Sequence, residues 1–194
     1  EQFIQDILIS HLKASHIVIG KNFRFGQLRQ GCSETIKKAG IDVSTIDPVL
    51  DKNHTRISSS RIRHALRNAD VNLANDLLGW QWEIEGTIFR GDRRGHELGY
   101  PTANLLLNDT LHPAYGIYAT QVQIEGEKDW RVAATNIGIR PMFELKQGQV
   151  EAHILDFPDH DIYGKKLRVR LVHRLRSEAK FNSIDDLIIQ MRKD

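Results

Sequence analysis

The stretch from Leu167 to Leu175, Leu-Arg-Val-Arg-Leu-Val-His-Arg-Leu, alternates apolar and charged residues with a period of two. Successive side chains of a β-strand point to opposite faces of a sheet. In such a strand Leu167, Val169 and Leu171 are buried, while Arg168 and Arg170 face water. The stretch therefore predicts an antiparallel-type strand with one buried and one wet face in the second half of the chain.

Similar short runs precede this strand, each rich in β-branched and aromatic residues and bounded by Gly, Pro, Asp or Asn. Several such strands at this spacing predict a small antiparallel barrel or sandwich. The runs are Glu83 to Arg90, Gly116 to Ile124, Trp130 to Asn136 and Val150 to Phe157.

The chain is expected to close with a helix. Ser183 stands where an N-cap belongs, and Asp186 follows three residues later, as in a capping box. The apolar stripe of this helix is formed by Ile184, Leu187, Ile188 and Met191.

Before Gly79 the pattern is different. A helical spacing from Phe3 to Leu12, a β-rich run from His16 to Ile19 closed by Gly20, a helix from Ile36 to Ala39 and a strand from Ile41 to Ile46 follow one another. This βαβ-like order predicts a parallel sheet with covering helices, the C-terminal half of an α/β domain.

Two further helices are expected before the strands begin. Ser58, Ser59 and Ser60 are N-cap candidates for the first, and the second runs from about Val71 to Leu78. We place the domain boundary near Gly79 to Gln81, which gives an α/β fragment over residues 1–80 and a β domain over residues 81–194.

Composition excludes several classes of protein. The 194 residues are 40% hydrophobic, and 27 Lys and Arg stand against 25 Asp and Glu, which gives no field that by itself implies nucleic acid or membrane. No apolar run approaches the roughly 20 residues needed to span a bilayer. Cys32 is the single cysteine, as expected in a reducing compartment. We expect a cytoplasmic protein without membrane partners, and a true start upstream of Glu1.

The densest chemical signal is the stretch Gly91-Asp-Arg-Arg-Gly-His-Glu-Leu-Gly-Tyr-Pro-Thr-Ala-Asn104. Its glycines allow backbone N–H groups to approach phosphate oxygens, but such loops are far more often plain turns, and this is not the Walker pattern. Thr102 and Asn104 add a hydroxyl and an amide, hard oxygen donors that Mg²⁺ accepts. From the residues alone, a structural turn remains the first reading.

This glycine-rich string resembles the recognition feature of riboflavin kinases. Three later blocks resemble that family in the same order. They are Asn136 to Pro141, similar to a family loop; Val150 to Phe157 with Asp161 to Gly164, similar to its catalytic-glutamate strand; and Leu175-Arg176 with Lys180 to Ser183, similar to the entry to its C-terminal helix. The resemblance implies a six-stranded Greek-key barrel with a C-terminal helix.

The resemblance also implies roles for single residues in a transfer of phosphate from ATP to riboflavin that gives FMN. Glu151 would be the catalytic base, Thr102 and Asn104 would hold the Mg²⁺ bound to ATP, and Asn136, Gly138 and Arg140 would bind the flavin. The nucleotide would be bound by Gly91, Arg94, Gly95, Gly99, Pro101, Thr102 and Asn104.

Without the resemblance, other readings of these residues stay open. Glu151 on a strand is more often a solvated outward residue than a base, and Arg140 is more often a surface charge. His153 shares a face with Glu151 and is expected to be structural. The family usually has Thr after Arg-Pro, whereas this chain has Met142.

The first part resembles the FMN adenylyltransferase domain of bifunctional FAD synthetases through Gly20 to Gly26 and Ile57 to Arg63. Gly20, Asn22, Ser59 and Arg61 would belong to a residual adenylyltransferase site, with Asn22 where the family commonly has Asp. None of the nine histidines lies in the His-x-Gly-His motif that this chemistry needs. We expect this domain to be partial and adenylyl transfer only in a full-length protein.

Two other functions stay open. One is a barrel that binds flavin or nucleotide without turnover. The other is single-stranded nucleic-acid binding through Arg61, Arg63, His64 and Arg67, although aromatic residues are only 7% of the chain. Neither function needs a metal site together with a base, so Thr102, Asn104 and Glu151 favour the kinase, with riboflavin and ATP as substrates and no nucleic-acid partner.

Overall fold

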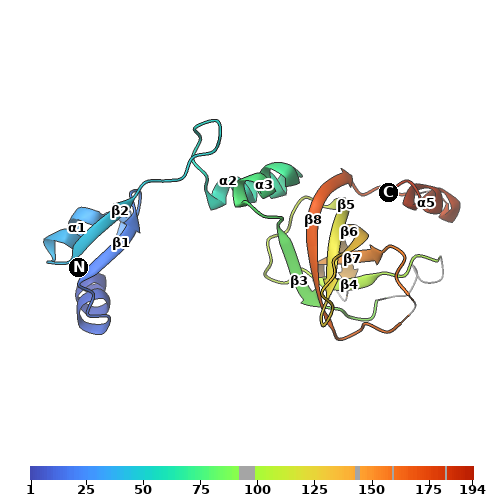
Figure 1. The fold of residues 1–194 in the computed structure, drawn as a ribbon, viewed down its shortest axis with the longest axis horizontal. Coiled ribbons are helices and arrows are strands. Elements are labelled where there is room, and N and C mark those ends of the chain that lie inside the picture. The colour runs from blue at the N-terminus through green and yellow to red at the C-terminus, as the bar shows by residue number, and fades with distance from the viewer. Residues whose placement is uncertain (92–98, 143–144, 159, 182) are drawn as a thin grey trace. The chain divides into compact units, whose positions relative to one another are not determined.

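The structure is a computed structural model. It describes residues 1–91, 99–142, 145–158, 160–181 and 183–194. The chain divides into two compact units, Glu1–Ile57 and Ser58–Asp194. Figure 1 shows their elements.

The first unit is a small α/β structure. Strand β1 (His16–Gly20) pairs in parallel with β2 (Asp42–Ile46). Helix η1 (Phe3–His11) precedes β1, and the short helix η2 (Gln27–Arg29) and α1 (Ser33–Lys38) connect the two strands. Its core is formed by apolar side chains of η1, of α1 and of the residue just before β2: Ile4, Leu8, Ile36 and Ile41. The predicted parallel α/β organisation is confirmed.

Two helices begin the second unit, α2 (Ser59–Arg67) and α3 (Val71–Leu78). The Ser58 hydroxyl caps α2 by accepting from the N–H of Arg61 at 3.4 Å, as expected for a serine at this position. Helix α3 ends at Gly79, whose φ of 79° is a left-handed conformation that glycine adopts without strain.

Both helices are packed against the β structure that follows. Val71 belongs to the core of the barrel, and Asn75 bridges two segments. Its Nδ2 donates to the carbonyl of Leu171 at 3.0 Å, while its Oδ1 accepts from the N–H of Trp82 at 2.8 Å. Residues 58–80 therefore pack as part of the same compact unit as the barrel. The division of the sequence into domains 1–80 and 81–194 stays a prediction.

The second unit contains a six-stranded antiparallel sheet with the order β3-β8-β5-β6-β7-β4. Its two edges meet where Phe89, just after β3, forms an antiparallel bridge with Asn104 of β4. The sheet is therefore a nearly closed barrel (Figure 1). Its strands are β3 (Glu83–Thr87), β4 (Ala103–Leu106), β5 (Gly116–Ile124), β6 (Arg131–Met142), β7 (Leu145–Ile154) and β8 (Lys166–Arg176).

Strands β5, β6 and β7 are joined in sequence, and β8 returns to lie beside β5. The spatial order β8-β5-β6-β7 is a Greek key. The expected six-stranded Greek-key barrel is confirmed, and so is the C-terminal helix α5 (Ile184–Met191), which Ser183 caps by accepting from the N–H of Asp186 at 3.1 Å.

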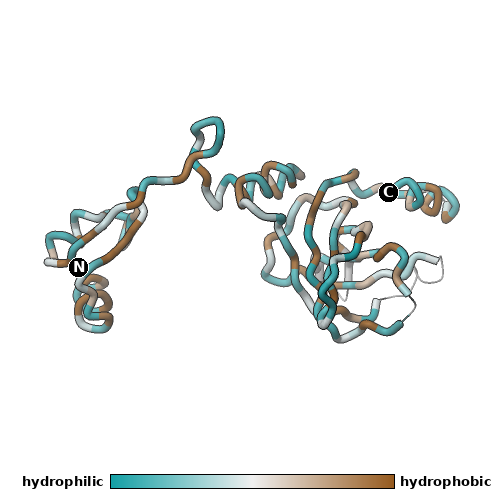
Figure 2. Tube along the Cα trace, viewed as in Figure 1, coloured by the Kyte–Doolittle hydropathy of each residue, from teal (hydrophilic) through white to brown (hydrophobic). Residues whose placement is uncertain are grey.

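The barrel core follows the alternation of each strand. In β8, Leu167, Val169 and Leu171 are fully buried, as the opening stretch of sequence predicts. Apolar residues of the other strands meet them and form one contiguous cluster. Figure 2 shows how hydrophobic and hydrophilic residues follow one another along these strands.

Two details differ from the sequence expectation. Ala103 to Leu106 form a strand, β4, which the sequence pattern did not predict because glycine and proline precede it. The block Asn136 to Pro141 was expected to be a loop and is part of β6. That expectation is wrong because this block pairs residue by residue with β7, from Asn136 opposite Glu151 to Pro141 opposite Lys146.

None of the helices among the described residues is both long and apolar enough to cross a membrane. The expected cytoplasmic location stays a prediction.

A ladder of charges lies on the outer side of β3 and β8. Glu83 stands opposite Arg170 and accepts from its Nε at 2.6 Å and from Nη2 of Arg168 at 2.6 Å. The Arg170 guanidinium in turn lies 3.6 Å from the ring centroid of Trp130, a cation–π contact. Burial by itself would raise the pKa of Glu83, but the hydrogen bonds from Arg170 and Arg168 outweigh it and hold the pKa below its ordinary value.

We expect Glu83→Gln to lower the free energy of unfolding by about 1 kcal/mol at pH 7. The folded-state pKa of Glu83 is depressed, so its contribution is fully present above the unfolded pKa of about 4.3 and is lost as pH falls through the folded value. The difference between parent and variant should therefore shrink below about pH 4. Urea unfolding at several pH values measures it.

Glu85→Gln is the matched control on the same strand, because the Glu85 side chain is 54% exposed and its ion pair with Lys166 is long, at 3.4 Å. It should change stability little at any pH. An equal effect of the two variants would contradict the assignment to the Glu83 ladder.

Candidate active site

Three of the predicted site residues lie in one row across three neighbouring strands. Glu151 of β7 is directly opposite Asn104 of β4 on one side and opposite Asn136 of β6 on the other. Directly opposed side chains share a face of the sheet. The residues flanking Glu151, Val150 and Ala152, point into the core and are fully buried. The row therefore lies on the face of the sheet that looks away from the core.

Asn104 is held firmly at one end of the row. Only 6% of its surface is exposed. Its Nδ2 donates to the carbonyl oxygen of Thr102 at 3.1 Å, and its Oδ1 accepts from Nε2 of Gln149 at 3.0 Å. An amide oxygen has two lone pairs, so one remains after the bond to Gln149. The Asn104 amide is thus oriented by the protein and still has an acceptor position.

The glycine-rich stretch meets this row at Gly91. A Cβ added to Gly91 would lie 2.8 Å from Nδ2 of Asn104, so only glycine lets the backbone lie directly against that amide. At the other end, Gly99 has a φ of 83°, a left-handed conformation. Glycine is therefore favoured at both positions, at Gly91 by the close approach to Asn104 and at Gly99 by the backbone conformation.

His153 anchors the chain just before β4. Its Nδ1 lies 2.9 Å from the carbonyl oxygen of Pro101, so Nδ1–H is the donor of this hydrogen bond. Its ring also packs edge-on against that of Tyr100, with centroids 5.2 Å apart. The structural role expected for His153 is thus supported by contacts that fix where the segment ending in Thr102 enters the sheet.

The middle of the row is poorly accessible to water. Oε1 of Glu151 and Oδ1 of Asn136 each have almost no exposed surface. Oδ1 of Asn136 accepts no hydrogen bond from any described residue. A buried acceptor without a donor costs about 1–3 kcal/mol, which a ligand N–H or O–H could recover.

Beyond Asn136, the outer face of β6 continues with Gly138, opposite Gln149. The carboxylate of Glu178, from the segment after β8, occupies the space next to Gly138, where an added Cβ would lie 2.9 Å from Cδ of Glu178 and closer still to Oε1. Burial first and the negative charge of Glu178 second raise the pKa of the nearby Tyr115. The Tyr115 hydroxyl is 2.8 Å from Nδ1 of His112.

Several predicted residues are not part of this row. Arg94 and Gly95 lie outside the described residues. Arg140 is in β6, but its side chain is outside the described part of the structure. Gly20 ends β1 and Asn22 follows it in the first unit, whereas Ser59 and Arg61 belong to α2 in the second unit. The residual adenylyltransferase site and the flavin contact of Arg140 stay predictions.

The row also extends across β5 to the end of β8. Ile117 of β5 pairs with Asn136 on one side and with Arg176 on the other. The guanidinium of Arg176 forms a bidentate pair with Asp194, from Nε to Oδ1 at 2.8 Å and from Nη2 to Oδ2 at 2.5 Å. Asp194 lies just after α5, so this pair clips the far end of α5 to the end of the row.

We expect Asp194→Asn to loosen α5. Burial by itself would raise the pKa of Asp194, but hydrogen bonds from Arg176 and Gln190 and the charge of Arg176 hold it below its ordinary value, so the carboxylate is ionised at neutral pH. Removing the charge weakens the clip, and we expect the amides of Ile184–Met191 to exchange hydrogen about tenfold faster. Asp129→Asn, in the exposed turn between β5 and β6, is the control. Equal exchange in the parent and both variants would contradict the clip.

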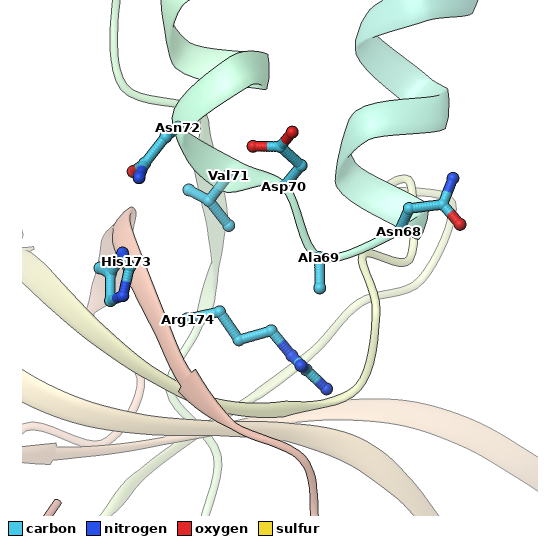
Figure 3. A pocket seen from close by; sticks show the side chains of 7 residues that line it. All are labelled: Asn68, Ala69, Asp70, Val71, Asn72, His173 and Arg174. Atoms are coloured by element: carbon cyan, nitrogen blue, oxygen red, sulfur yellow. The ribbon is translucent and has the colours of Figure 1, made fainter.

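A pocket of about 300 Å³ lies between the α2–α3 turn and the end of β8 (Figure 3). It is lined by Asn68 to Asn72 and by His173 and Arg174, and by none of the predicted site residues. Asp70, on its rim, already caps α3 by accepting from the N–H of Leu73 at 3.0 Å. We assign no role to this pocket.

The sequence reasoning missed two residues that contact the row. Gln149 stands two residues before Glu151 and so shares its face, a signal that strand periodicity contains. Glu178 had no such signal, because its segment follows β8 without a regular pattern and only the fold brings it to Gly138.

Known protein families match both parts of the chain. The family model described as riboflavin kinase matches residues 78–194, and the one described as FAD synthetase matches residues 1–61.

Curated relatives match over the whole chain. It is 36% identical over 197 residues to the bifunctional riboflavin kinase/FMN adenylyltransferase of Escherichia coli (strain K12), and 38% identical over 203 residues to the protein of the same name from Bacillus subtilis (strain 168). Each match covers 100% of this chain and 62% of the relative, so the chain spans less than two thirds of their length.

A solved structure has the same fold. A crystal structure described as a macrolide-efflux protein from Streptococcus pneumoniae is similar with a TM-score of 0.84 and 34% identity, over 100% of this chain and 62% of that one. The likeness concerns fold and sequence, and the described activity belongs to that protein.

Proposed function

The chain belongs to the riboflavin kinase family, with part of an FAD synthetase region before the kinase module, and on this premise we propose that its barrel phosphorylates riboflavin with ATP to give FMN. The observation that carries the proposal is the row Asn104, Glu151 and Asn136, which sets one carboxylate between two amides on neighbouring strands. Riboflavin and ATP are the proposed substrates.

Glu151 is the proposed general base. It accepts the proton of the 5′-hydroxyl of the ribityl chain as that oxygen forms a bond to the γ-phosphorus of ATP. The bond from this phosphorus to the β–γ bridging oxygen breaks, and ADP leaves with the electron pair. The position of Glu151 in the centre of the row, with Oε1 almost fully buried, supports this role because a base must be placed and kept from bulk water.

Thr102 and Asn104 are the proposed protein ligands of Mg²⁺. A hydroxyl and an amide oxygen are hard donors of the kind this ion takes, and the Asn104 amide is already oriented and has an acceptor position left. When bound with ATP, Mg²⁺ would neutralise charge on the phosphates during transfer. A site with few protein ligands is expected where substrate phosphates supply the rest.

The nucleotide is proposed to lie on the β4 side of Glu151 and the flavin on the β6 side. Gly91 lies against Asn104 of β4, and Gly99 and Pro101 precede that strand in the chain, where backbone groups can approach phosphates. Asn136 and Gly138 lie on the other side of Glu151, and the unpartnered Oδ1 of Asn136 offers an acceptor to a neutral ligand.

The test is to incubate the chain with riboflavin, ATP and Mg²⁺ and to separate the flavins chromatographically. Formation of FMN and ADP in equal amounts is expected. Riboflavin that binds without any FMN forming would instead favour the non-catalytic binding module. Adenylyl transfer to FMN is proposed only for a longer chain that carries the His-x-Gly-His motif.

A further inference from the structure

We propose that Glu178 is a further substrate-binding residue, whose carboxylate accepts a hydrogen bond from riboflavin on the β6 side of Glu151. The inference rests on the proposed function, since it places riboflavin rather than ATP on this side. Nothing in the sequence singled out Glu178, and the fold brings it there.

The Glu178 carboxylate is close to the row of site residues. It fills the space that a side chain at Gly138 would need, so it lies directly on the outer face of β6. Gly138 is two residues from Asn136, which places the two positions on the same face about 7 Å apart. Glu178 therefore stands beside the end of the row that holds the unpartnered Oδ1 of Asn136.

The negative charges of Glu178 and Glu151 favour a neutral ligand beside Asn136. Glu151 lies opposite Asn136 on β7, and Glu178 lies at Gly138, two residues further along β6. All three side chains present oxygen acceptors. Two carboxylates disfavour a polyphosphate by like-charge repulsion and favour a neutral ligand that carries hydrogen-bond donors. Riboflavin is such a ligand, with ribityl hydroxyls and one ring N–H. A hydrogen bond to a carboxylate is stronger than one between neutral groups, so Glu178 should contribute more than the Asn136 amide does.

The test compares binding of riboflavin with that of ATP. In Glu178→Ala, the Kd for riboflavin, read from the quenching of its fluorescence, should rise about tenfold, while the KM for ATP changes by less than about twofold. Glu178→Gln keeps the size but not the charge and should fall between parent and Glu178→Ala. Asp129→Asn, in the exposed turn between β5 and β6, is the control and should leave both constants unchanged.

A second variant tests the same contact from the other side. Gly138→Ala places a methyl group where the Glu178 carboxylate now lies, and it should weaken riboflavin binding to a similar degree. Both changes displace the same carboxylate. The Kd of the double variant Gly138→Ala/Glu178→Ala for riboflavin should therefore be no higher than the higher of the two single-variant values. Additive losses would contradict the inference that both variants act by displacing the Glu178 carboxylate.

An unchanged Kd for riboflavin in Glu178→Ala would overturn the inference, whether or not the parent forms FMN. A parent that binds riboflavin but forms no FMN would overturn the kinase proposal and leave the Glu178 test valid, because binding is measured without turnover. Unfolding curves of every variant check that the barrel remains folded.

Discussion

Glu151→Gln is expected to slow FMN formation about 10²- to 10⁴-fold at saturating riboflavin and ATP. Glutamine has nearly the same shape as glutamate, but it cannot take up the proton of the attacking hydroxyl. The loss should therefore appear in kcat. The Kd of riboflavin should change by less than about threefold, because the proposed flavin contacts lie at Asn136 and Glu178 and not at the proton acceptor.

The measurement is initial-rate kinetics with chromatographic detection of FMN. Asp129→Asn again provides a surface control, and thermal unfolding shows whether Glu151→Gln alters the barrel. A variant that binds riboflavin normally and keeps its full turnover would exclude Glu151 as the base. A variant that loses binding along with turnover would point to a structural role for this side chain.

Asn104→Leu is expected to lower kcat about 10²- to 10³-fold, the range found when one group that stabilises transition-state charge is removed. Leucine removes the amide oxygen proposed to contact Mg²⁺. It also leaves Nε2 of Gln149, a residue only 4% exposed, without the acceptor it now has at 3.0 Å. A buried donor without a partner costs about 1–3 kcal/mol, so the free energy of unfolding should fall as well.

Asn104→Asp separates these two effects. Aspartate keeps the oxygen that accepts from Gln149 and is proposed to contact the metal, but it loses the Nδ2 donor to the Thr102 carbonyl. It should therefore keep more activity than Asn104→Leu and need less Mg²⁺ for half-maximal rate, because a carboxylate attracts the ion more strongly. Gln149→Leu is the companion variant: it keeps the Asn104 side chain but removes the hydrogen bond that orients its oxygen. Equal Mg²⁺ dependence in the parent and in Asn104→Asp would argue against Asn104 as a metal ligand.

The local pattern of the sequence determined most of the secondary structure. The alternation from Leu167 to Leu171 predicted β8 with buried Leu167, Val169 and Leu171, because the side-chain period of a strand is two. Ser58, Gly79 and Ser183 marked helix ends because capping needs a hydroxyl or a left-handed residue at those positions. The parallel pair of β1 and β2 followed from the alternation of helix and strand.

Strand β4 and the long β6 could not be predicted in the same way. Ala103 to Leu106 is only four residues long and follows a proline, so its local propensity is weak, and pairing with β7 is what makes it a strand. The block after Asn136 contains Gly138 and Pro141, which normally interrupt strands. It is extended because β7 pairs with it along its whole length.

By itself, the sequence determined the fold class, the family resemblance and the proposed base, since these depend on residue types in a fixed order along the chain. Only the tertiary structure decided that Asn104, Glu151 and Asn136 stand in one row, that Gln149 orients Asn104, and that Glu178 lies over Gly138. The reason is that strand register and the path of the chain after β8 are set by contacts between residues far apart in sequence, and the fit of the whole barrel selects them.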